Sequence, residues 1–255
     1  MSAYKAFQDG WRGRIGLIAP APGSAAEKEF NHYVPEGVAV LTTRIPLYAI
    51  SYESLKTMTG YVDEAAKMLT ESAAVDIILF NCTAGSFLEE GNYDIRLVRH
   101  LEEITNLPAV TTSTCILEAM DAYRAEKIHI VTPYSEEINE RERIFFSSRG
   151  KTVLSVTGAL LTDSRDVPKI PPGDMYRYAL EADTDDADLI LISCTGLHVL
   201  TIIDALEKDL KKPVISSNQC ALWGTLNKLG VHDEIRGIGS LFNTDAVCGP
   251  QGSRG

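Results

Sequence analysis

The stretches VDIILFNCTAG (75–85) and ADLILISCTGL (187–197) decide the fold of this chain. In each one an aspartate is followed by a short apolar run and then by a polar segment that carries a cysteine, Cys82 or Cys194. A short, continuous apolar run of this kind is typical of a strand that is buried on both faces, as in a parallel sheet. The same pattern at two distant places indicates that the chain contains a duplicated α/β unit.

Two further pairs of segments repeat in the same order. WRGRIGLIAP, which ends at Pro20, corresponds to AEKIHIVTP, which ends at Pro133, and LPAVTTST from Leu107 corresponds to KPVISSNQ from Lys212. Ordered matches at nearly one interval indicate a single doubling, because a solenoid would show shorter periods and more copies. We therefore predict a first half, residues 1–122 with the C-terminal tail from about 231–255, and a second half, residues 123–230.

The pattern along each half predicts alternating strands and helices. Strand-like runs cover 14–19, 75–80, 127–131 and 188–192, and helix-like stretches such as 53–72 and 201–210 lie between them. We expect an α/β protein of two similar Rossmann-like halves, each with a parallel sheet, related by a pseudo-twofold axis. Ligands bind beyond the C-terminal ends of such strands, where both cysteines lie. The active site is therefore expected in the cleft between the halves, with Cys82 and Cys194 facing each other.

Composition and charge exclude several classes of function. The chain has 255 residues and a net charge of −11, with Lys and Arg scattered, which argues against nucleic-acid binding. It contains no apolar run long enough for a membrane helix, and residues 1–14 lack the apolar core of a signal peptide. We expect a cytoplasmic protein without membrane contact. The sequence leaves open whether it forms a homo-oligomer.

The remaining cysteines and the histidines give no sign of a metal site. The cysteine count is odd and no C-x-x-C pair is present, so a disulfide framework or a zinc site is not expected. Cys115, Cys220 and Cys248 are interpreted as small packed hydrophobic residues. No histidine cluster, phosphate loop or dinucleotide motif is present, and we expect no metal and no cofactor. His198 lies near Cys194 in the sequence, where a structural role is favoured over a role in the site.

Two facing thiols are suited to proton transfer at a carbon next to a carboxylate. Such a reaction needs a base on one face of the carbon and an acid on the other. A free thiol has a pKa of about 8.5, close enough to neutrality for one cysteine to be thiolate and its partner thiol. Thr83 and Thr195 sit beside the thiols and offer hydrogen-bond donors. Further donors, for which helix capping is an equal alternative, are Ser24, Ser113, Thr114, Ser216, Ser217 and Asn218.

Four segments carry a resemblance to a known group of enzymes. They are APAPGSAAEKEF from Ala19, IVTPYSEEINER from Ile130, SCTGL from Ser193 and KPVISSNQCALW from Lys212. From Arg14 to about Leu241 the chain resembles the aspartate/glutamate racemase superfamily, especially its branch of maleate cis-trans isomerases and arylmalonate decarboxylases. The resemblance implies catalysis by Cys82 and Cys194 on a small carboxylate substrate. It places substrate-binding residues at Pro20, Gly23, Ser24, Asn81, Thr83, Ala84, Tyr134, Thr195 and Gly196.

The resemblance favours an isomerase or racemase over a decarboxylase. The decarboxylases are similar to this chain at Tyr134, at 139–141 and at Cys194, but they typically carry Gly where this chain has Cys82. Decarboxylation needs one acid to protonate an enediolate, whereas racemisation and cis-trans isomerisation in this family use both cysteines. In a maleate isomerase, the cysteine matching Cys82 adds to the double bond, rotation and elimination give fumarate, and the counterpart of Cys194 transfers a proton.

The first loop departs from the pattern of the maleate isomerases. Those enzymes carry P-S-S-N there, with the Asn on a substrate carboxylate, whereas residues 20–23 of this chain read PAPG. A second Asn expected near 163–165 is also absent. The substrate is therefore expected to be a different small acid with one carboxylate replaced. An arylmalonate-type decarboxylase and a non-catalytic small-molecule-binding domain remain as the alternatives.

Overall fold

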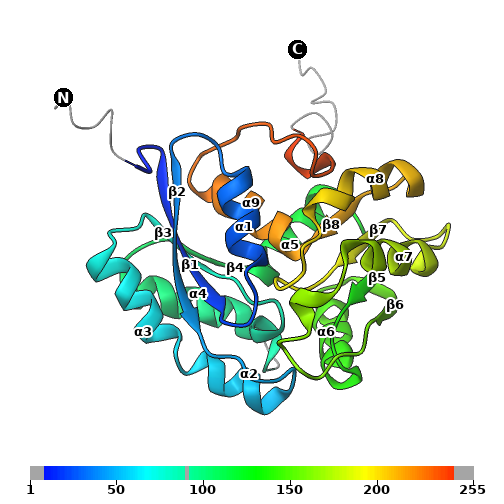
Figure 1. Cartoon of the computed structure of the whole chain (residues 1–255), viewed down its shortest axis with the longest axis horizontal. Coiled ribbons are helices and arrows are strands. Elements are labelled where there is room, and N and C mark those ends of the chain that lie inside the picture. Colours follow the sequence, from blue (N-terminus) through cyan, green and yellow to red (C-terminus); the bar gives the residue numbers. More distant parts are fainter. Residues whose placement is uncertain (1–8, 90–91, 244–255) are drawn as a thin grey trace.

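The structure, a computed structural model, describes residues 9–89 and 92–243 and contains two four-stranded parallel sheets (Figure 1). The first sheet has the order β2-β1-β3-β4, with β1 (Gly13–Pro20), β2 (Val38–Ile45), β3 (Ile77–Phe80) and β4 (Ala109–Thr111). The second has the order β6-β5-β7-β8, with β5 (Lys127–Thr132), β6 (Thr152–Gly158), β7 (Leu189–Ile192) and β8 (Val214–Ser216). The two orders are equivalent, which confirms the prediction of two Rossmann-like halves.

Helices follow the strands in both halves. In the first half they are α1 (Ala25–Tyr33), α2 (Tyr52–Thr59), α3 (Val62–Lys67), η2 (Met68–Ser72), η3 (Ala84–Phe87), α4 (Tyr93–Thr105) and α5 (Thr112–Ala122). In the second half and beyond they are α6 (Glu136–Ser148), η4 (Val167–Lys169), α7 (Pro172–Ala182), α8 (Leu200–Leu210), α9 (Ser217–Lys228) and η5 (Ser240–Phe242). Within the described ranges, none of these helices is long and apolar enough to cross a membrane.

The repeated Asp-plus-apolar motif has the same structural role in both sheets. All residues of β3 and β7 are buried, as the continuous apolar runs predicted. The carboxylate of Asp76, just before β3, accepts the backbone N–H of Arg14 at 2.8 Å. That of Asp188 accepts the N–H groups of Glu126 and Lys127 at 2.9 and 2.8 Å. Each aspartate thus holds the start of the neighbouring central strand, β1 or β5.

The single helix expected over 53–72 is interrupted. Helix α2 ends at Thr59, and Gly60 closes a turn through its N–H to the carbonyl of Thr57 at 3.2 Å. Helix α3 then begins at Val62, and the last five residues form a π-helical turn, η2. Glycine is among the poorest helix formers, so a break at this position has a local cause.

Helices α5 and α9 pack against each other between the sheets, where they join the halves (Figure 1). Each begins with a capping box, made by Thr111 with Thr114 and by Ser216 with Gln219. A β-carbon placed at Gly224 of α9 would lie 2.5 Å from the sulfur of Cys115 on α5, so only glycine permits this approach. Cys115 and Cys220 are fully buried, as expected of packed residues.

The described part of the C-terminal tail contacts both halves. Asp233 forms an ion pair with Arg12 in the first half. The carbonyl of Ile238 accepts a hydrogen bond from Gln219, and the N–H of Ser240 donates to Glu207 at 2.7 Å, both in the second half. Residues 244–255, with Cys248, lie outside the described residues, as do residues 1–8 at the start of the predicted first half.

Candidate active site

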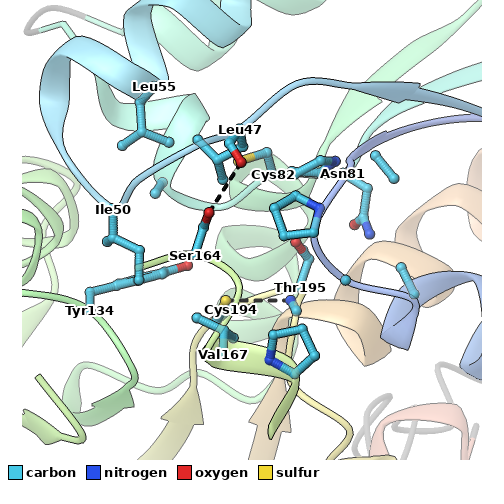
Figure 2. A pocket seen from close by; sticks show the side chains of 18 of the residues that line it. Leu47, Ile50, Leu55, Asn81, Cys82, Tyr134, Ser164, Val167, Cys194 and Thr195 are labelled. Carbon is cyan, nitrogen blue, oxygen red and sulfur yellow. Dashed lines mark hydrogen bonds between the residues drawn. The ribbon is translucent and has the colours of Figure 1, made fainter. Parts of the chain in front are cut away.

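A cavity lies at the C-terminal ends of the strands and is lined by both halves (Figure 2). The first half contributes Ala19, Pro20, Pro22, Gly23, Ala26, Glu27, Leu47, Ile50, Leu55, Asn81, Cys82 and Ala84. The second contributes Tyr134, Ser164, Val167, Pro168, Cys194, Thr195 and Gly196. The cavity thus brings together the two cysteines and most of the residues named as substrate-binding from the sequence. Ser24 and Thr83 are the two that do not line it.

Cys82 lies two residues beyond the end of β3 and is 4% exposed. Its sulfur accepts the backbone N–H of Gly85 at 3.3 Å, from the short helix η3. Burial raises the pKa of the Cys82 thiol to about 12, the Gly85 hydrogen bond opposes this rise, and the nearby Cys194 adds to it. Cys82 is therefore a neutral thiol at physiological pH.

Cys194 occupies the equivalent position beyond β7, on a strained backbone. Its φ of 147° is one that residues with a side chain rarely adopt, and such strain is often stored at functional sites. Its N–H donates to the hydroxyl of Ser217 at 3.0 Å, and its sulfur accepts the N–H of Gly196 at 3.4 Å. Burial raises the pKa of the Cys194 thiol to about 11, against the opposing hydrogen bonds from Gly196 and Tyr134.

These pKa values differ from the expectation for free thiols. The sequence suggested that one cysteine could be ionised near neutrality, but burial in a largely apolar cavity disfavours the thiolate at both positions. Backbone donors are present at Gly85 and Gly196, and they only partly offset this effect. A reaction that uses a thiolate must therefore form it transiently, with these N–H groups stabilising the charge.

Tyr134 is positioned by a small hydrogen-bond network at the end of β5. The hydroxyl of Thr132 accepts the N–H of Tyr134 at 3.1 Å and donates to the side-chain oxygen of Asn139 at 2.5 Å. The amide of Asn139 donates in turn to the carbonyl of Tyr134 at 3.3 Å. Burial, and then the proximity of Cys194, raises the pKa of Tyr134 well above its usual value. The phenol is thus a neutral donor beside Cys194 (Figure 2).

Two loops close the cavity, and the sequence drew attention to only one of them, through the Asn expected near 163–165. The loop after β2 provides Leu47 and Ile50, and the loop after β6 provides Ser164, Val167 and Pro168. They contact each other through the N–H of Ile50, which donates to Thr162 at 2.8 Å, and the hydroxyl of Ser164, which donates to Leu47 at 3.1 Å. No motif marks these residues, although both loops follow strands and the strand-end rule applies to them.

The cavity offers neutral donors and no cation. Among the described residues that line it, Glu27 is the only charged side chain, and it forms an ion pair with Arg44. The first loop reaches the Cys194 loop closely, since a β-carbon at Gly23 would lie 3.3 Å from the Cα of Gly196. A bound carboxylate would therefore depend on backbone N–H groups, hydroxyls and the Asn81 amide.

The remaining candidates lie outside the cavity. Ser24 takes the N-cap position of α1 without a side-chain hydrogen bond. Thr83 is fully buried and donates to Ser217, Ser113 donates to the carbonyl of Thr83, and Thr114 and Ser216 cap helices. His198 is not a lining residue. In the loop after β6, near the position of the expected Asn, Asp163 forms an ion pair with Arg165, and Asp166 forms one with Lys169.

Two buried glutamates near the site carried no signal in the sequence. Glu29 on α1 and Glu142 on α6 occupy amphipathic helices, where a glutamate is normally exposed. The hydroxyl of Ser193, the residue before Cys194, donates to Glu142 at 2.5 Å. Burial raises the pKa of Glu142 to about 8 and that of Glu29 to about 7. No group of His, Cys, Asp or Glu in the described ranges is arranged to hold a metal ion.

Known proteins share this fold and sequence pattern. The family model of arylmalonate decarboxylase matches residues 15–242. The arylmalonate decarboxylase of Bordetella bronchiseptica is 27% identical over 235 residues, which cover 90% of this chain and 96% of that protein. A variant of the maleate isomerase Iso from Pseudomonas putida S16, solved with maleate, superposes with a TM-score of 0.87 at 23% identity, covering 90% of this chain and 97% of the other.

A second solved structure has the same degree of similarity. It is a mutant of the Nocardia farcinica maleate cis-trans isomerase with a covalently bound succinylcysteine intermediate, with a TM-score of 0.87 at 20% identity, covering 91% of this chain and 99% of the other. The relatives are thus divided between decarboxylases and isomerases. The chain itself belongs to the arylmalonate decarboxylase family, in the branch of the Asp/Glu racemase-like superfamily that also contains the maleate isomerases.

Proposed function

We propose that this protein is a cofactor-independent isomerase or racemase that acts on a small carboxylic acid with Cys82 and Cys194. The observation that carries the proposal is the shared cavity, into which each half contributes one thiol from an equivalent position after β3 or β7. Two acid–base groups from opposite sides are what proton exchange at one carbon requires. Membership of a family of enzymes that act on small carboxylic acids supports the same proposal.

In the racemase form of this reaction, one cysteine removes the α-proton and the other returns a proton to the opposite face. The intermediate is an enediolate, whose charge needs preorganised donors. Tyr134, Thr195 and the Asn81 amide line the cavity as neutral donors of this kind. In the cis-trans form, a thiolate adds to a carbon–carbon double bond, by analogy with the succinylcysteine of the Nocardia farcinica enzyme.

The lining of the cavity favours a monocarboxylate with an apolar substituent over a dicarboxylate. Leu47, Ile50, Leu55, Val167 and Pro168 provide an apolar wall, and the described residues of the lining include no Lys or Arg to hold a second carboxylate. The first loop has Gly23 where a maleate isomerase would place Asn. An apolar group on the α-carbon would fill the space that a second carboxylate would otherwise need.

Decarboxylation of a substituted malonate is the second candidate. The relative that is 27% identical is an arylmalonate decarboxylase, and the same apolar wall would accept its α-substituent. Loss of CO₂ produces the enediolate without a base, so that one thiol is sufficient. Cys82 is the residue that separates the two reactions, since only the isomerase or racemase requires it.

The test is turnover of a panel of small acids in D₂O, followed by NMR. The panel should include both enantiomers of 2-aryl and 2-alkyl propionates, maleate, and aryl- and alkylmalonates. Deuterium entering the α-position with loss of optical purity, or cis-trans conversion, would support the proposal. Release of CO₂ that persists in Cys82→Ser would favour the decarboxylase, and saturable binding without turnover of any acid would indicate a binding domain.

A further inference from the structure

Glu29 is a buried carboxylate outside the cavity that joins the two halves. One oxygen accepts the N–H groups of Val199 and Leu200, at the start of α8, at 2.9 and 3.1 Å. The other accepts the side-chain amide of Asn218, on α9, at 2.7 Å. Glu29 itself lies on α1 of the first half, and all three donors belong to the second.

The hydrogen bonds continue from Asn218 to both cysteine loops. The amide nitrogen of Asn218 also donates to the carbonyl of Thr195, the residue after Cys194, at 3.2 Å. The amide oxygen of Asn218 accepts from Asn81, the residue before Cys82, at 3.3 Å. Asn81 in turn accepts the hydroxyl of Thr112 at 2.8 Å. One amide thus connects a neighbour of each thiol, and Glu29 holds that amide.

The direction of the bonds in this network is set by two acceptors of the Asn218 amide, Glu29 and the Thr195 carbonyl. An ionised carboxylate only accepts hydrogen bonds, so Asn218 must turn its NH₂ group towards Glu29. The oxygen of Asn218 then faces Asn81, which must present its own NH₂ group and leave its oxygen for Thr112. A Gln at position 29 could not accept on both sides, because its NH₂ group would meet either the NH₂ group of Asn218 or the N–H groups of Val199 and Leu200.

We propose that Glu29 is a positioning residue that fixes the Asn81 amide and the Thr195 carbonyl, and through them the relative placement of the Cys82 and Cys194 loops. The consequence for turnover rests on the proposed two-cysteine function, whereas the consequence for the thiols themselves does not. Because Glu29 does not line the cavity, it acts through Asn218 and not by touching a substrate.

Protonation of Glu29 should reverse the direction of the hydrogen bonds that run from it through Asn218 and Asn81. A proton on the oxygen that faces Asn218 would require that amide to turn over and to release the Thr195 carbonyl. Burial raises the pKa of Glu29 to about 7, against the lowering effect of the hydrogen bonds from Asn218, Leu200 and Val199. The positioned arrangement should therefore be complete above neutral pH and weaken as the pH falls through about 7.

Other ionisable groups near Glu29 lie on the elements that pack against it. They are Glu27, Lys28, His32 and Tyr33 on α1, Arg44 on β2, His198 before α8, and Cys220 and Lys228 on α9. Arg44 is paired with Glu27, and burial lowers the pKa of His198, with the charge of Lys28 adding to the effect. A Glu29→Gln variant distinguishes the titration of Glu29 from that of His198.

The experiment measures how fast each thiol is alkylated by iodoacetamide, with Cys82 and Cys194 separated by peptide mass spectrometry, across about pH 6–9. Glu29→Gln keeps the shape and removes the charge. The matched control is Glu207→Gln, a half-buried glutamate on α8 that accepts the N–H groups of Val214 and Ser240 away from the cavity. Asn218→Ser interrupts the same hydrogen-bond network at the residue next to Glu29. It replaces Glu29→Gln in the experiment if that variant does not fold.

We expect Glu29→Gln and Asn218→Ser to change the ratio of the two alkylation rates by roughly tenfold, the scale of one buried hydrogen bond, and to remove a step near pH 7 in that ratio. On a substrate, kcat should fall by a similar factor with little change in KM, whereas Glu207→Gln should cost stability and leave both readouts unchanged. A wild-type ratio without the step, or equal effects of Glu29→Gln and Glu207→Gln, would overturn the proposal. Absence of turnover in the wild type, with the alkylation results as expected, would instead count against the proposed function alone.

Discussion

The hydroxyl of Thr83, the residue after Cys82, donates a hydrogen bond of 2.9 Å to the hydroxyl of Ser217. Ser217 also accepts the N–H of Cys194 at 3.0 Å. A pair of hydroxyls therefore links the loop of one thiol to the backbone of the other. Since both side chains are fully buried, no water can replace either partner without rearrangement of the loops.

Replacing Ser217 with Ala should leave the N–H of Cys194 and the hydroxyl of Thr83 without their acceptor. The free energy of unfolding should fall by about 1–3 kcal/mol, the cost of an unsatisfied buried polar group. Chemical denaturation measures this loss. Ser148→Ala is the control, since Ser148 is exposed on α6 and its change should stay within about 0.5 kcal/mol. Equal stability of the two variants would contradict the linking role.

Replacing either Cys82 or Cys194 with Ser should abolish isomerisation or racemisation. Serine is nearly isosteric but has a far higher pKa, so the proton-transfer or nucleophilic step should slow by roughly a thousandfold or more. The double variant should be little worse than either single one, because one loss already breaks the relay. Turnover of the most active acid of the panel provides the measurement. Near-normal activity of Cys82→Ser beside an inactive Cys194→Ser would point to one-cysteine chemistry.

Alkylation of the wild-type thiols should accelerate throughout the neutral and mildly alkaline range. The pKa of Cys194 is raised to about 11 and that of Cys82 to about 12, so the thiolate fraction of each should grow about tenfold for every pH unit between about pH 7 and 9. Cys194 should react faster. The urea-unfolded protein is the reference, in which the rate should reach half of its maximum near pH 8.5. A plateau below about pH 8 in the folded protein would show that a thiolate exists at rest.

Tyr134→Phe should act on Cys194 before it acts on any substrate. The phenol donates to the Cys194 sulfur and lowers its pKa, so its loss should raise that pKa and slow alkylation of Cys194 several-fold at a fixed pH, on the order of 1 kcal/mol. Cys82 is the internal control within the same sample. Turnover should fall by roughly ten- to a hundredfold, less than for the cysteine variants. An unchanged rate of Cys194 alkylation in Tyr134→Phe would show that Tyr134 does not affect the thiol.

Glu142→Gln should change the pH dependence of stability. The pKa of Glu142 is raised by burial to about 8, so the folded state binds more protons than the unfolded state between about pH 4.5 and 8, and the wild type loses stability as the pH rises through this range. Gln carries no charge and avoids this loss. The variant should therefore gain about 1–3 kcal/mol relative to the wild type from about pH 5 to pH 8 in thermal or urea unfolding. A constant difference across the range would contradict it.

Local sequence determined much of the fold and located the two thiols. The apolar runs of β3 and β7 are buried throughout, and the aspartates that precede them perform the same task in both halves. Because strand formation and the position of a loop after a strand depend on neighbouring residues, the placement of Cys82 and Cys194 at the strand ends followed from the duplication alone. Tyr134, which follows β5, was recognised through the family resemblance of the segment that contains it.

Tertiary structure alone decided the electrostatics and the closure of the cavity. The pKa values of both thiols depend on burial, which is contributed by residues far away in the chain. Glu29 meets Val199 and Asn218 across more than a hundred residues, and nothing in an amphipathic helix marks that glutamate as buried. The loops with Ile50 and Thr162 likewise meet only after both sheets have formed. A sequence pattern records which groups are present, whereas desolvation and hydrogen bonding depend on which distant groups the folded chain places beside them.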